Sequence, residues 1–408
     1  MTWEKVKLSE CCESICDGDH QPPPKAENGI PFVTISNINS FHQFDFSNTM
    51  YVPLAYYDQL DAKRKAQKGD ILYSVVGSFG IPVLIKNNNP FVFQRHIAIL
   101  RPNKKIIPAF LFYTMLSNDF YAQADAAAIG AAQRTISLNA LRHMEFMLPS
   151  IKEQEVIVDI LSVYDDLIEN NQKQIKLLEE AAQRLYKEWF VDFRFPGHET
   201  IPIINSLPEG WKDVTIADVC ETVGGGTPST SHDEYYENGT IRWVTPTDLT
   251  KNKSIILLDT EKKITQKGLS SCAAKMLSPN TILMTSRASI GYFAVCEHEV
   301  CTNQGFISCI PKQEEMRYYL LFNLMNRVDE IKGKASGSTF LEIAKRTFRD
   351  MKICVPNEKL LHCFSLLISP IISKIRILEK EKTDLVNSRD RLLPKLMNGE
   401  LLIKINYL

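Results

Sequence analysis

Two stretches of this 408-residue chain carry the same helical pattern of apolar residues, 207 positions apart. In each stretch the pattern advances by alternating steps of four and three residues, which places one narrow stripe along a helix, as the seam of a coiled coil requires. The seams are Ile157, Leu161, Tyr164, Ile168, Asn171, Ile175, Leu178, Ala182, Leu185, Trp189 and Phe364, Ile368, Ile371, Ile375, Leu378, Lys382, Leu385, Arg389, Leu392, Leu396. Two seams in one register predict two copies of a globular domain plus a long helix, with the helices packed on each other.

The repeat extends into the segments that precede the helices. Pro149 and Pro356 stand in front of the two helices, 207 positions apart, and Phe32-Val33-Thr34 matches Trp243-Val244-Thr245 at an offset of 211. A period near 200 residues is far too long for a solenoid, so it indicates duplication of a whole domain. Identity between these anchors is low, and the two globular halves are therefore diverged copies.

Composition places the chain among ordinary globular proteins. Its length predicts two or three domains, each large enough to bury a core. Apolar residues make up 44% of the chain and charged residues 23%, which is typical of soluble proteins. A net charge of −1 gives no support to non-specific binding of nucleic acid.

Targeting and redox signals point to the cytoplasm. The longest apolar run, from Leu360 to Ile372, is too short for a transmembrane span and falls on the second seam. The N-terminus has no apolar region of the kind found in a secretory signal. The ten cysteines have no zinc-binding spacing, so we expect reduced thiols, no metal site, no membrane and a cytoplasmic location.

Short β-like runs dominate the first 150 residues and predict an α+β domain. The runs are Pro31–Ile35, Ile71–Val76, Pro82–Lys86 and His96–Arg101, followed by a helical stretch from Pro108 to Asp125. Turn residues separate them, and the second half repeats the same order. We therefore expect a mixed α+β fold in which two globular domains are separated by two long antiparallel coiled-coil helices, with a pseudo-twofold internal repeat.

The predicted domain boundaries follow the helix signals. We expect globular domains over residues 1–150 and 197–355, and helical segments over residues 151–196 and 356–408. Pro196-Gly197 should stop the first helix near Phe195, and Asn398-Gly399 should stop the second. Pro370 marks a first-turn start or a kink of the second helix, and Pro394 a second kink.

Polar residues interrupt both seams. Asn171 lies on the first seam, and Lys382 and Arg389 lie on the second. A polar residue on a seam costs stability but fixes the register and orientation of the helices. Alternatively, these positions lie where the helices diverge and face solvent, and the sequence leaves both readings open.

No catalytic motif is present. The chain has no Walker A loop, no GxSxG and no HExxH, and the Gly224-Gly225-Gly226 run has no lysine at P-loop spacing. An amino-methyltransferase would carry an Asn/Asp-Pro-Pro-aromatic tetrapeptide, and Asn89-Pro90-Phe91 lacks the second proline. The pattern favours a non-catalytic binding protein without a cofactor, with two recognition heads.

The helical segments carry two sets of recognisable motifs. The first helix contains Glu153-Gln154, Ile160-Leu161-Ser162, Asp165 to Asn171, Leu178 to Gln183 and Lys187 to Phe193, and the second contains Leu385 to Leu401. These motifs resemble the central and the C-terminal conserved regions of a known family, the specificity (S) subunits of type I restriction–modification systems. The openings of the two globular halves, Asp17 to His20 and Gly226 to Thr230 with Trp243 to Asp248, resemble those of the family's target recognition domains. The resemblance covers the whole chain.

The resemblance implies a function and a set of partners. Such a subunit reads a split, asymmetric sequence in double-stranded DNA, one half for each recognition domain. Its conserved helices bind two modification (methyltransferase) subunits, and restriction (motor-nuclease) subunits join them. We expect partner contacts at Tyr186, Trp189, Phe190, Phe193, Leu392 and Leu396. The alternative is a two-headed adaptor with a coiled-coil spacer that does not bind DNA.

Candidate DNA contacts lie in loops at equivalent places in the two halves, where polar side chains can reach base edges or phosphates. The paired loops are Ser36-Asn37 with Thr247-Asp248, Gly77-Ser78 with Ser286-Arg287, Gln94-Arg95 with Asn303-Gln304, and Gln133-Arg134-Thr135 with Ser336 to Thr339. The individual candidates are Ser36, Asn37, Ser78, Gln94, Arg95, Gln133, Arg134, Thr227, Ser229, Thr230, Thr247, Asp248, Ser286, Arg287, Asn303, Gln304, Ser338 and Thr339. Differences between the copies fit two different half-sites, although any one loop could simply be a turn.

Overall fold

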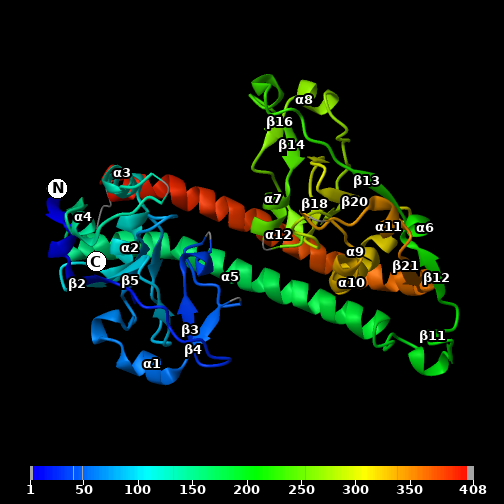
Figure 1. The fold of residues 1–408 in the computed structure, drawn as a ribbon, viewed down its shortest axis with the longest axis horizontal. Helices are drawn as coiled ribbons and strands as arrows, with labels where there is room; N and C mark the ends of the chain where they lie inside the picture. Colours follow the sequence, from blue (N-terminus) through cyan, green and yellow to red (C-terminus); the bar gives the residue numbers. More distant parts are fainter. Residues whose placement is uncertain are drawn as a thin grey trace, which may run out of the picture. The chain divides into compact units, whose positions relative to one another are not determined.

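The protein divides into two units, each of which combines one globular head with one end of a pair of long helices (Figure 1). The first unit contains Met1–Asp166 and Leu385–Leu408, and the second contains Leu167–Asp384. The computed structural model describes residues 3–39, 41–47, 49–131, 133–252, 254–337 and 339–401. We call the globular parts of the two units the first head (residues 3–148) and the second head (residues 203–355).

The first head is built on a four-stranded antiparallel sheet in the order β2-β8-β5-β6. A second sheet has three strands in the order β4-β3-β7, and its strands β3 and β7 are parallel. The β1 strand pairs with β9. The bounds are β1 Glu4–Lys7, β2 Cys12–Asp17, β3 Ile30–Val33, β4 Met50–Val52, β5 Ile71–Ser74, β6 Pro82–Leu84, β7 Val92–Phe93, β8 Ile97–Pro102 and β9 Glu145–Leu148.

The helices of the first head are short. They are α1 Leu54–Gln59, α2 Pro108–Leu116, α3 Asn118–Ala127 and α4 Leu138–Arg142. The helical stretch predicted from Pro108 to Asp125 is present as two helices, because Ser117 adopts an extended conformation with ψ 148° and separates α2 from α3. Its hydroxyl accepts a hydrogen bond from the Phe120 N–H at 3.3 Å, so this serine caps the second helix.

The second head repeats this arrangement. Its main sheet has five strands in the order β13-β20-β17-β18-β15, a three-stranded sheet follows the order β16-β14-β19 with β14 and β19 parallel, and β12 pairs with β21. A small hairpin, β10-β11, precedes them. The bounds are β10 Ile203–Ile204, β11 Leu207–Pro208, β12 Lys212–Thr215, β13 Cys220–Gly224, β14 Ile241–Val244, β15 Ile256–Leu257, β16 Lys263–Ile264, β17 Ile282–Thr285, β18 Phe293–Cys296, β19 Cys301–Thr302, β20 Phe306–Pro311 and β21 Lys352–Val355.

Short helices flank these sheets. They are α6 Ile216–Val219, α7 Pro246–Lys251, α8 Gln266–Ser270, α9 Met316–Asn326, α10 Val328–Gly333 and α11 Lys345–Arg349. The α9 helix is buried on most sides, with Tyr319, Leu320 and Phe322 each at most 1% exposed. It therefore forms part of the hydrophobic core of the second unit.

The two heads are structural copies, as the sequence repeat predicts. The β1–β9 pairing aligns Glu4 with Leu148, and the β12–β21 pairing aligns Lys212 with Val355, so corresponding residues lie 208 and 207 positions apart. A register shift between Cys12 and Ser14 in β2 places one extra residue in the first head. The bulge lowers the offset between the copies from 208 at Cys12 and Cys220 to 207 at Ser14 and Glu221, and later insertions raise it to 211 at Phe32 and Trp243.

Two 40-residue helices, α5 (Ile151–Phe190) and α12 (Glu358–Met397), carry the predicted seams. Within the second unit Asn171 of α5 contacts Glu381 of α12, and the rings of Tyr186 and Phe364 lie 6.4 Å apart. From the first contact to the second, the residue number rises along α5 and falls along α12, so the helices run antiparallel. Every seam residue is buried or half-buried, which confirms the predicted α+β fold with a packed helix pair.

The helix ends and the polar seam positions differ in detail from the expectation. The α5 helix ends at Phe190 rather than near Phe195, because Phe193 has a left-handed backbone with φ 56°. The α12 helix begins at Glu358 and continues through Pro370 and Pro394, so Pro370 does not start it. Asn171 is 4% exposed and donates to Glu381 at 3.2 Å, so this position is not a solvent-facing gap.

One long helix also satisfies the length and composition of a membrane span. Over its most apolar window α12 has a mean hydropathy of 1.5, and 33% of that window is buried in the structure. A core helix of a soluble protein passes the same test, and Phe364, Ile368 and Ile375 are fully buried on the seam. The sequence expectation that no run reaches this length rested on the shorter stretch from Leu360 to Ile372.

Candidate nucleic-acid interface

In the first head, the loop after β5 lies against the loop before α4. Gly77 donates its N–H to the Arg134 carbonyl oxygen at 2.9 Å, and Val76 forms an isolated antiparallel bridge with Thr135. Gly77 has φ 71°, in the left-handed region that glycine adopts without strain. The structure therefore brings together two loops that the sequence had proposed separately, with Ser78 exposed beside Gln133.

The second head forms the same contact with different side chains. Ala288, with φ 59°, donates its N–H to Leu341 O at 2.8 Å, and Arg287 bridges Glu342. Arg287 thus stands where the first head has Val76, and Gly77-Ser78 corresponds to Ala288 and the residue after it. The predicted pairing of Gly77-Ser78 with Ser286-Arg287 is therefore shifted by two residues, because these loops keep the offset of 211 that relates the preceding strands β5 and β17.

A second group of loops forms at the end of β2 and β13. The backbone N–H of Asp19 donates to the Phe93 carbonyl oxygen at 3.1 Å, and the N–H of its counterpart Gly226 donates to the Thr302 carbonyl oxygen at 2.9 Å. A Cβ on Gly225 would lie 2.1 Å from the Asn303 carbonyl oxygen, so glycine is required for this close approach. The approach places Thr227 and Gln304 within hydrogen-bonding contact at the surface.

The Asp17-Gly18-Asp19-His20 motif forms a local ion-pair network. Asp17 lies 2.7 Å from His20 Nε2 and 3.6 Å from Arg64, and Asp19 accepts a hydrogen bond from the Tyr56 hydroxyl. Burial and then this hydrogen bond raise the pKa of Tyr56 to about 12, so the phenol stays protonated and keeps donating. The network fixes the loop that opens the first head.

Three predicted contact residues are buried, and two of them hold their own loops through side-chain hydrogen bonds. Asn37 is 7% exposed and accepts from the Thr34 N–H at 2.9 Å, and Asp248 is 9% exposed and accepts from the Thr245 N–H at 2.7 Å. These are equivalent helix caps, and Thr-x-x-Asn and Thr-x-x-Asp are sequence patterns of the capping-box kind. Ser286 is 2% exposed. The side chains of Asn37 and Asp248 therefore stabilise loops rather than project from the surface.

The remaining predicted contact residues lie at or near the surface. Their side chains are exposed in Ser36, Ser78, Arg95, Gln133, Thr227, Ser229, Thr230, Thr247, Arg287, Gln304 and Thr339, and half-buried in Gln94, Arg134 and Asn303. Ser338 lies outside the described residues. Burial and then the charge of Arg95 lower the pKa of His96, so the cation at this loop is the arginine alone at neutral pH. DNA contact by these residues stays a prediction.

The predicted partner-binding residues lie in the interior. Tyr186, Trp189 and Phe190 are at most 7% exposed in the core of the second unit, and Leu396 is 2% exposed in that of the first. Phe193 and Leu392 are half-buried. Large apolar side chains that do reach solvent lie off the seams, at Leu177, Leu366, Leu367 and Ile377, with 50–64% exposure. In the sequence, these four exposed side chains can be recognised because they are apolar and lie outside the heptad seam.

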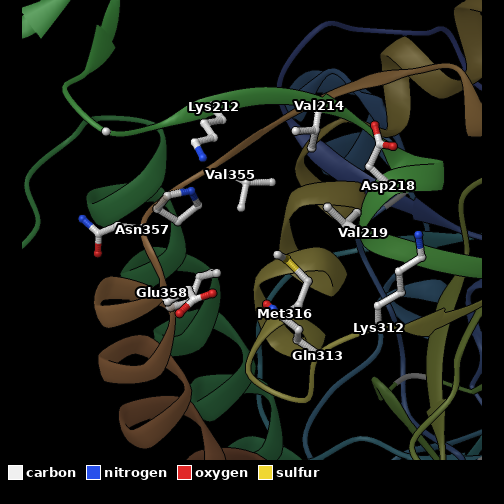
Figure 2. Close-up of a pocket in the computed structure, with 13 residues that line it drawn as sticks. Lys212, Val214, Asp218, Val219, Lys312, Gln313, Met316, Val355, Asn357 and Glu358 are labelled. Atoms are coloured by element: carbon white, nitrogen blue, oxygen red, sulfur yellow. The ribbon is translucent and has the colours of Figure 1, made fainter.

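A pocket of about 510 Å³, which the sequence did not indicate, lies in the second unit between β12, α6 and the beginnings of α9 and α12 (Figure 2). Val214, Val219 and Met316 form its apolar lining. Two of its charged groups are tied to the fold, since Lys312 donates to Ala217 O at 2.9 Å and Asp218 accepts from the Thr215 hydroxyl at 2.6 Å. Across the described residues no group of His, Cys, Asp or Glu could hold a metal ion.

Comparison with known proteins connects this architecture to one family. Residues 1–180 and 208–384 match the family described as the type I restriction modification DNA specificity domain. Over 98% of the chain, the sequence is 24% identical to the specificity subunit of the type I restriction enzyme HindI from Haemophilus influenzae, of which it covers 99%. Over 42% of the chain, it is 36% identical to the MjaIX specificity subunit of Methanocaldococcus jannaschii, covering 40% of that protein.

A solved structure has the same fold. The crystal structure of the S subunit of a type I restriction–modification system from M. genitalium superimposes with a TM-score of 0.57. The match covers 97% of this chain and 96% of that chain at 18% sequence identity. The arrangement of two heads and two long helices is thus shared with a protein of this family.

Proposed function

The chain belongs to the DNA specificity family of type I restriction–modification systems, as a non-catalytic specificity subunit, and we propose that each of its heads reads one half of a split, asymmetric DNA target. One observation supports the proposal that the two heads read different halves of the target. The heads repeat the same loop contact while exchanging the side chains on it, with Val76 in one copy and Arg287 in the other. Equivalent loops with different side chains are what two different half-sites require.

The helix pair supplies surfaces for the other subunits. We propose that two methyltransferase subunits dock on it through exposed apolar residues such as Leu177 and Ile377, which are 64% and 57% exposed. Apolar side chains of this size at the centre of an interface contribute strongly to binding once they are buried. Restriction subunits would join this core complex in the cytoplasm, where the host DNA lies. Partner-supplied cations would provide much of the phosphate contact that a chain of net charge −1 lacks.

A domain exchange tests the half-site assignment. Residues 1–150 are replaced by the corresponding domain of a related specificity subunit, and both helices and the second head are kept. We expect one half of the methylated motif to change while the other half and the gap between them stay the same. Methylation sequencing of DNA from a host that carries the methyltransferase subunits measures the outcome. A motif that changes in both halves, or in neither, would contradict the assignment.

A further inference from the structure

Two adjacent large apolar side chains project from the second head. Phe340 is 57% exposed and Leu341 is 53% exposed, next to the turn that contains Arg287 and Ala288. We call these four residues the second tip. An exposed phenylalanine or leucine contributes little to folding, and burying either against a partner is favourable. A contiguous apolar tip on a surface otherwise lined by polar loops therefore indicates a binding contact.

The backbone holds the second tip in place. Ser336 and Glu342 exchange two hydrogen bonds, of 3.0 and 2.9 Å, which close the base of the loop. Gly337 has φ 137°, and a Cβ there would lie 2.2 Å from the Phe340 carbonyl oxygen, so the tight loop needs this glycine. The hydrogen bond from Ala288 to Leu341 attaches the loop to the end of β17. The two apolar side chains are thus presented by a loop that is anchored at its base and on one side.

Positive charge flanks the second tip along the chain. Five cationic side chains and one acidic side chain lie between Lys332 and Arg349. The equivalent segment of the first head, Asp125 to Arg142, has two cationic side chains and one acidic. An apolar pair in a segment with an excess of cationic residues fits a partner with an anionic exterior and an apolar interior. Duplex DNA, with phosphates outside and stacked bases inside, has this distribution.

The first head has no such tip. Gln133 is exposed at the position of Phe340, and Arg134 stands at the position of Leu341. Arg134 folds back over the Phe79 ring at 5.1 Å and pairs with Asp125 at 2.6 Å. The exposed apolar side chain of this loop in the first head is Ile129, 71% exposed, which lies at the base of the loop, where the second head has Ser336. The turn that follows therefore presents polar groups at Gln133 and Arg134 in one copy and apolar groups at Phe340 and Leu341 in the other.

We propose that Phe340 and Leu341 act as a wedge that enters between neighbouring base pairs of the half-site read by the second head, and that the first head contacts DNA without a wedge. The inference rests on the proposed function, because it needs the second head to face DNA. Apolar side chains inserted in this way unstack a base step and bend the duplex, and the cost depends on the sequence. The wedge would thus add specificity for an easily unstacked step.

The test uses the chain assembled with its methyltransferase subunits and duplexes that contain its methylated motif. The fluorescent base 2-aminopurine replaces each purine of the second half-site in turn, except the methylated adenine. We expect its fluorescence to rise at one step when the wild-type complex binds. Phe340→Ala and Leu341→Ala should remove the rise and weaken binding roughly 10- to 100-fold, the range expected for losing one base-stacking contact. Phe340→Leu, which keeps an apolar wedge, should retain most of both.

A matched control accompanies these variants. Ile203→Ala removes a side chain that is also 57% exposed but lies in the β10–β11 hairpin. It should not alter the fluorescence in the second half-site. The substituted side chains are mainly in solvent, so the variants should fold, which thermal unfolding of each complex checks.

The outcomes separate the two proposals. If the wild-type complex methylates its motif but the tip variants keep both their affinity and the fluorescence rise, the wedge is wrong and the proposed function stands. If the variants lose the methyltransferase subunits instead, the second tip docks a protein, which also overturns the wedge. If the wild-type complex methylates no motif at all, the proposed function fails and the wedge fails with it.

Discussion

The two heads are attached to the same helix pair by different side chains. At the end of α5, Tyr186, Trp189 and Phe190 pack into the core of the second unit with Phe364 and Tyr319. The positions 207 residues later, at the end of α12, hold Leu393, Leu396 and Met397, which pack into the core of the first unit. Equal positions in two copies of one fold thus carry an aromatic anchor in one unit and an aliphatic anchor in the other.

A second exchange concerns the helix crossing itself. In the first unit Asp165 of α5 pairs with Arg389 of α12 at 2.7 Å, and the Tyr113 hydroxyl donates to the same carboxylate at 2.6 Å. In the second unit the equivalent positions are Ile372 and Ala182, at 1% and 0% exposure. Duplication has therefore kept the geometry while one copy uses ions and the other uses apolar packing. The comparison separates what the fold needs from what each copy adds.

The largest effect is expected from the aromatic anchor. The Phe190 ring centroid lies 4.8 Å from those of both Tyr319 and Phe364, in edge-to-face contact, and the residue is 7% exposed. Phe190→Ala should lower the free energy of unfolding of the second unit by about 3–5 kcal/mol, because it leaves a cavity among packed rings. Urea unfolding followed by tryptophan fluorescence measures this, since Trp189 and Trp211 lie in the same core.

The control is the neighbouring residue. Val191 is 39% exposed, so Val191→Ala should change the unfolding free energy by less than about 0.5 kcal/mol. Hydrogen exchange in the first unit should be the same in both variants. If Phe190→Ala cost no more than Val191→Ala, the aromatic anchor would have no special role in holding the second head.

The elements that the sequence predicted correctly are those with a long, regular pattern. The predicted seams are confirmed because a stripe of ten positions stays recognisable when single residues in it are polar. Asn171 is one such residue, and it pairs with Glu381 inside the helix pair. Local stops were missed where one residue decides. Ser117 splits a helix by capping the next one, and Phe193 ends α5 by turning left-handed. Such events depend on backbone angles that no periodicity records.

The site was predictable at the level of loops and not of side chains. The repeat identifies two loops in each head. In the first head the structure brings the loop of Gly77 against the loop of Gln133, and in the second head it brings the loop of Arg287 against the loop of Leu341. The repeat did not show that Asn37 and Asp248 are caps, although both follow a threonine by three positions. The sequence gives no signal for the exposed apolar pair Phe340-Leu341, because apolar residues of this kind are usually buried.

An intermediate effect is expected from the ion pair. Arg389 and Asp165 have side chains that are only 13% and 22% exposed, so Arg389→Ala leaves a carboxylate without its main partner in a poorly solvated place. We expect a loss of about 3 kcal/mol from the stability of the first unit. Hydrogen exchange of peptides covering residues 105–116 and 385–397 measures it.

Transplanting the residues of the second unit sharpens the comparison. The triple variant Asp165→Ile, Arg389→Ala and Tyr113→Phe replaces the polar cluster with the apolar residues of the other crossing and leaves no unpaired phenol. A buried ion pair exchanged for apolar packing is often neutral or stabilising, so most of the lost stability should return. If the triple variant were less stable than Arg389→Ala alone, the ion pair would be required by the geometry of this crossing.

The smallest effect is expected from the carboxylate of Glu179, which belongs to the second unit. Glu179 of α5 accepts hydrogen bonds from the Ile255 N–H at 2.7 Å and the Ser254 hydroxyl at 3.0 Å. The position 207 residues later on α12 is Val386, so the first unit has no equivalent. Burial raises the pKa of Glu179, the two hydrogen bonds oppose the rise, and the nearby Glu379 adds to it.

The raised pKa sets the sign of a pH effect. Because the folded second unit binds the Glu179 proton more tightly than the unfolded chain, its stability falls as pH rises from the ordinary carboxyl pKa of about 4.3 to the raised folded value, and is constant above it. The slope is at most about 1.4 kcal/mol per pH unit for one proton. Glu179→Gln keeps an oxygen that can accept both hydrogen bonds and removes the titration. We therefore expect this variant to lose that part of the slope in urea unfolding measured between pH 4 and 7, with the hydrogen-exchange pattern of the first unit unchanged. An identical slope in the variant and the wild type would mean that the carboxylate stays charged throughout, and that the polar contact between α5 and the second head contributes nothing to the pH dependence.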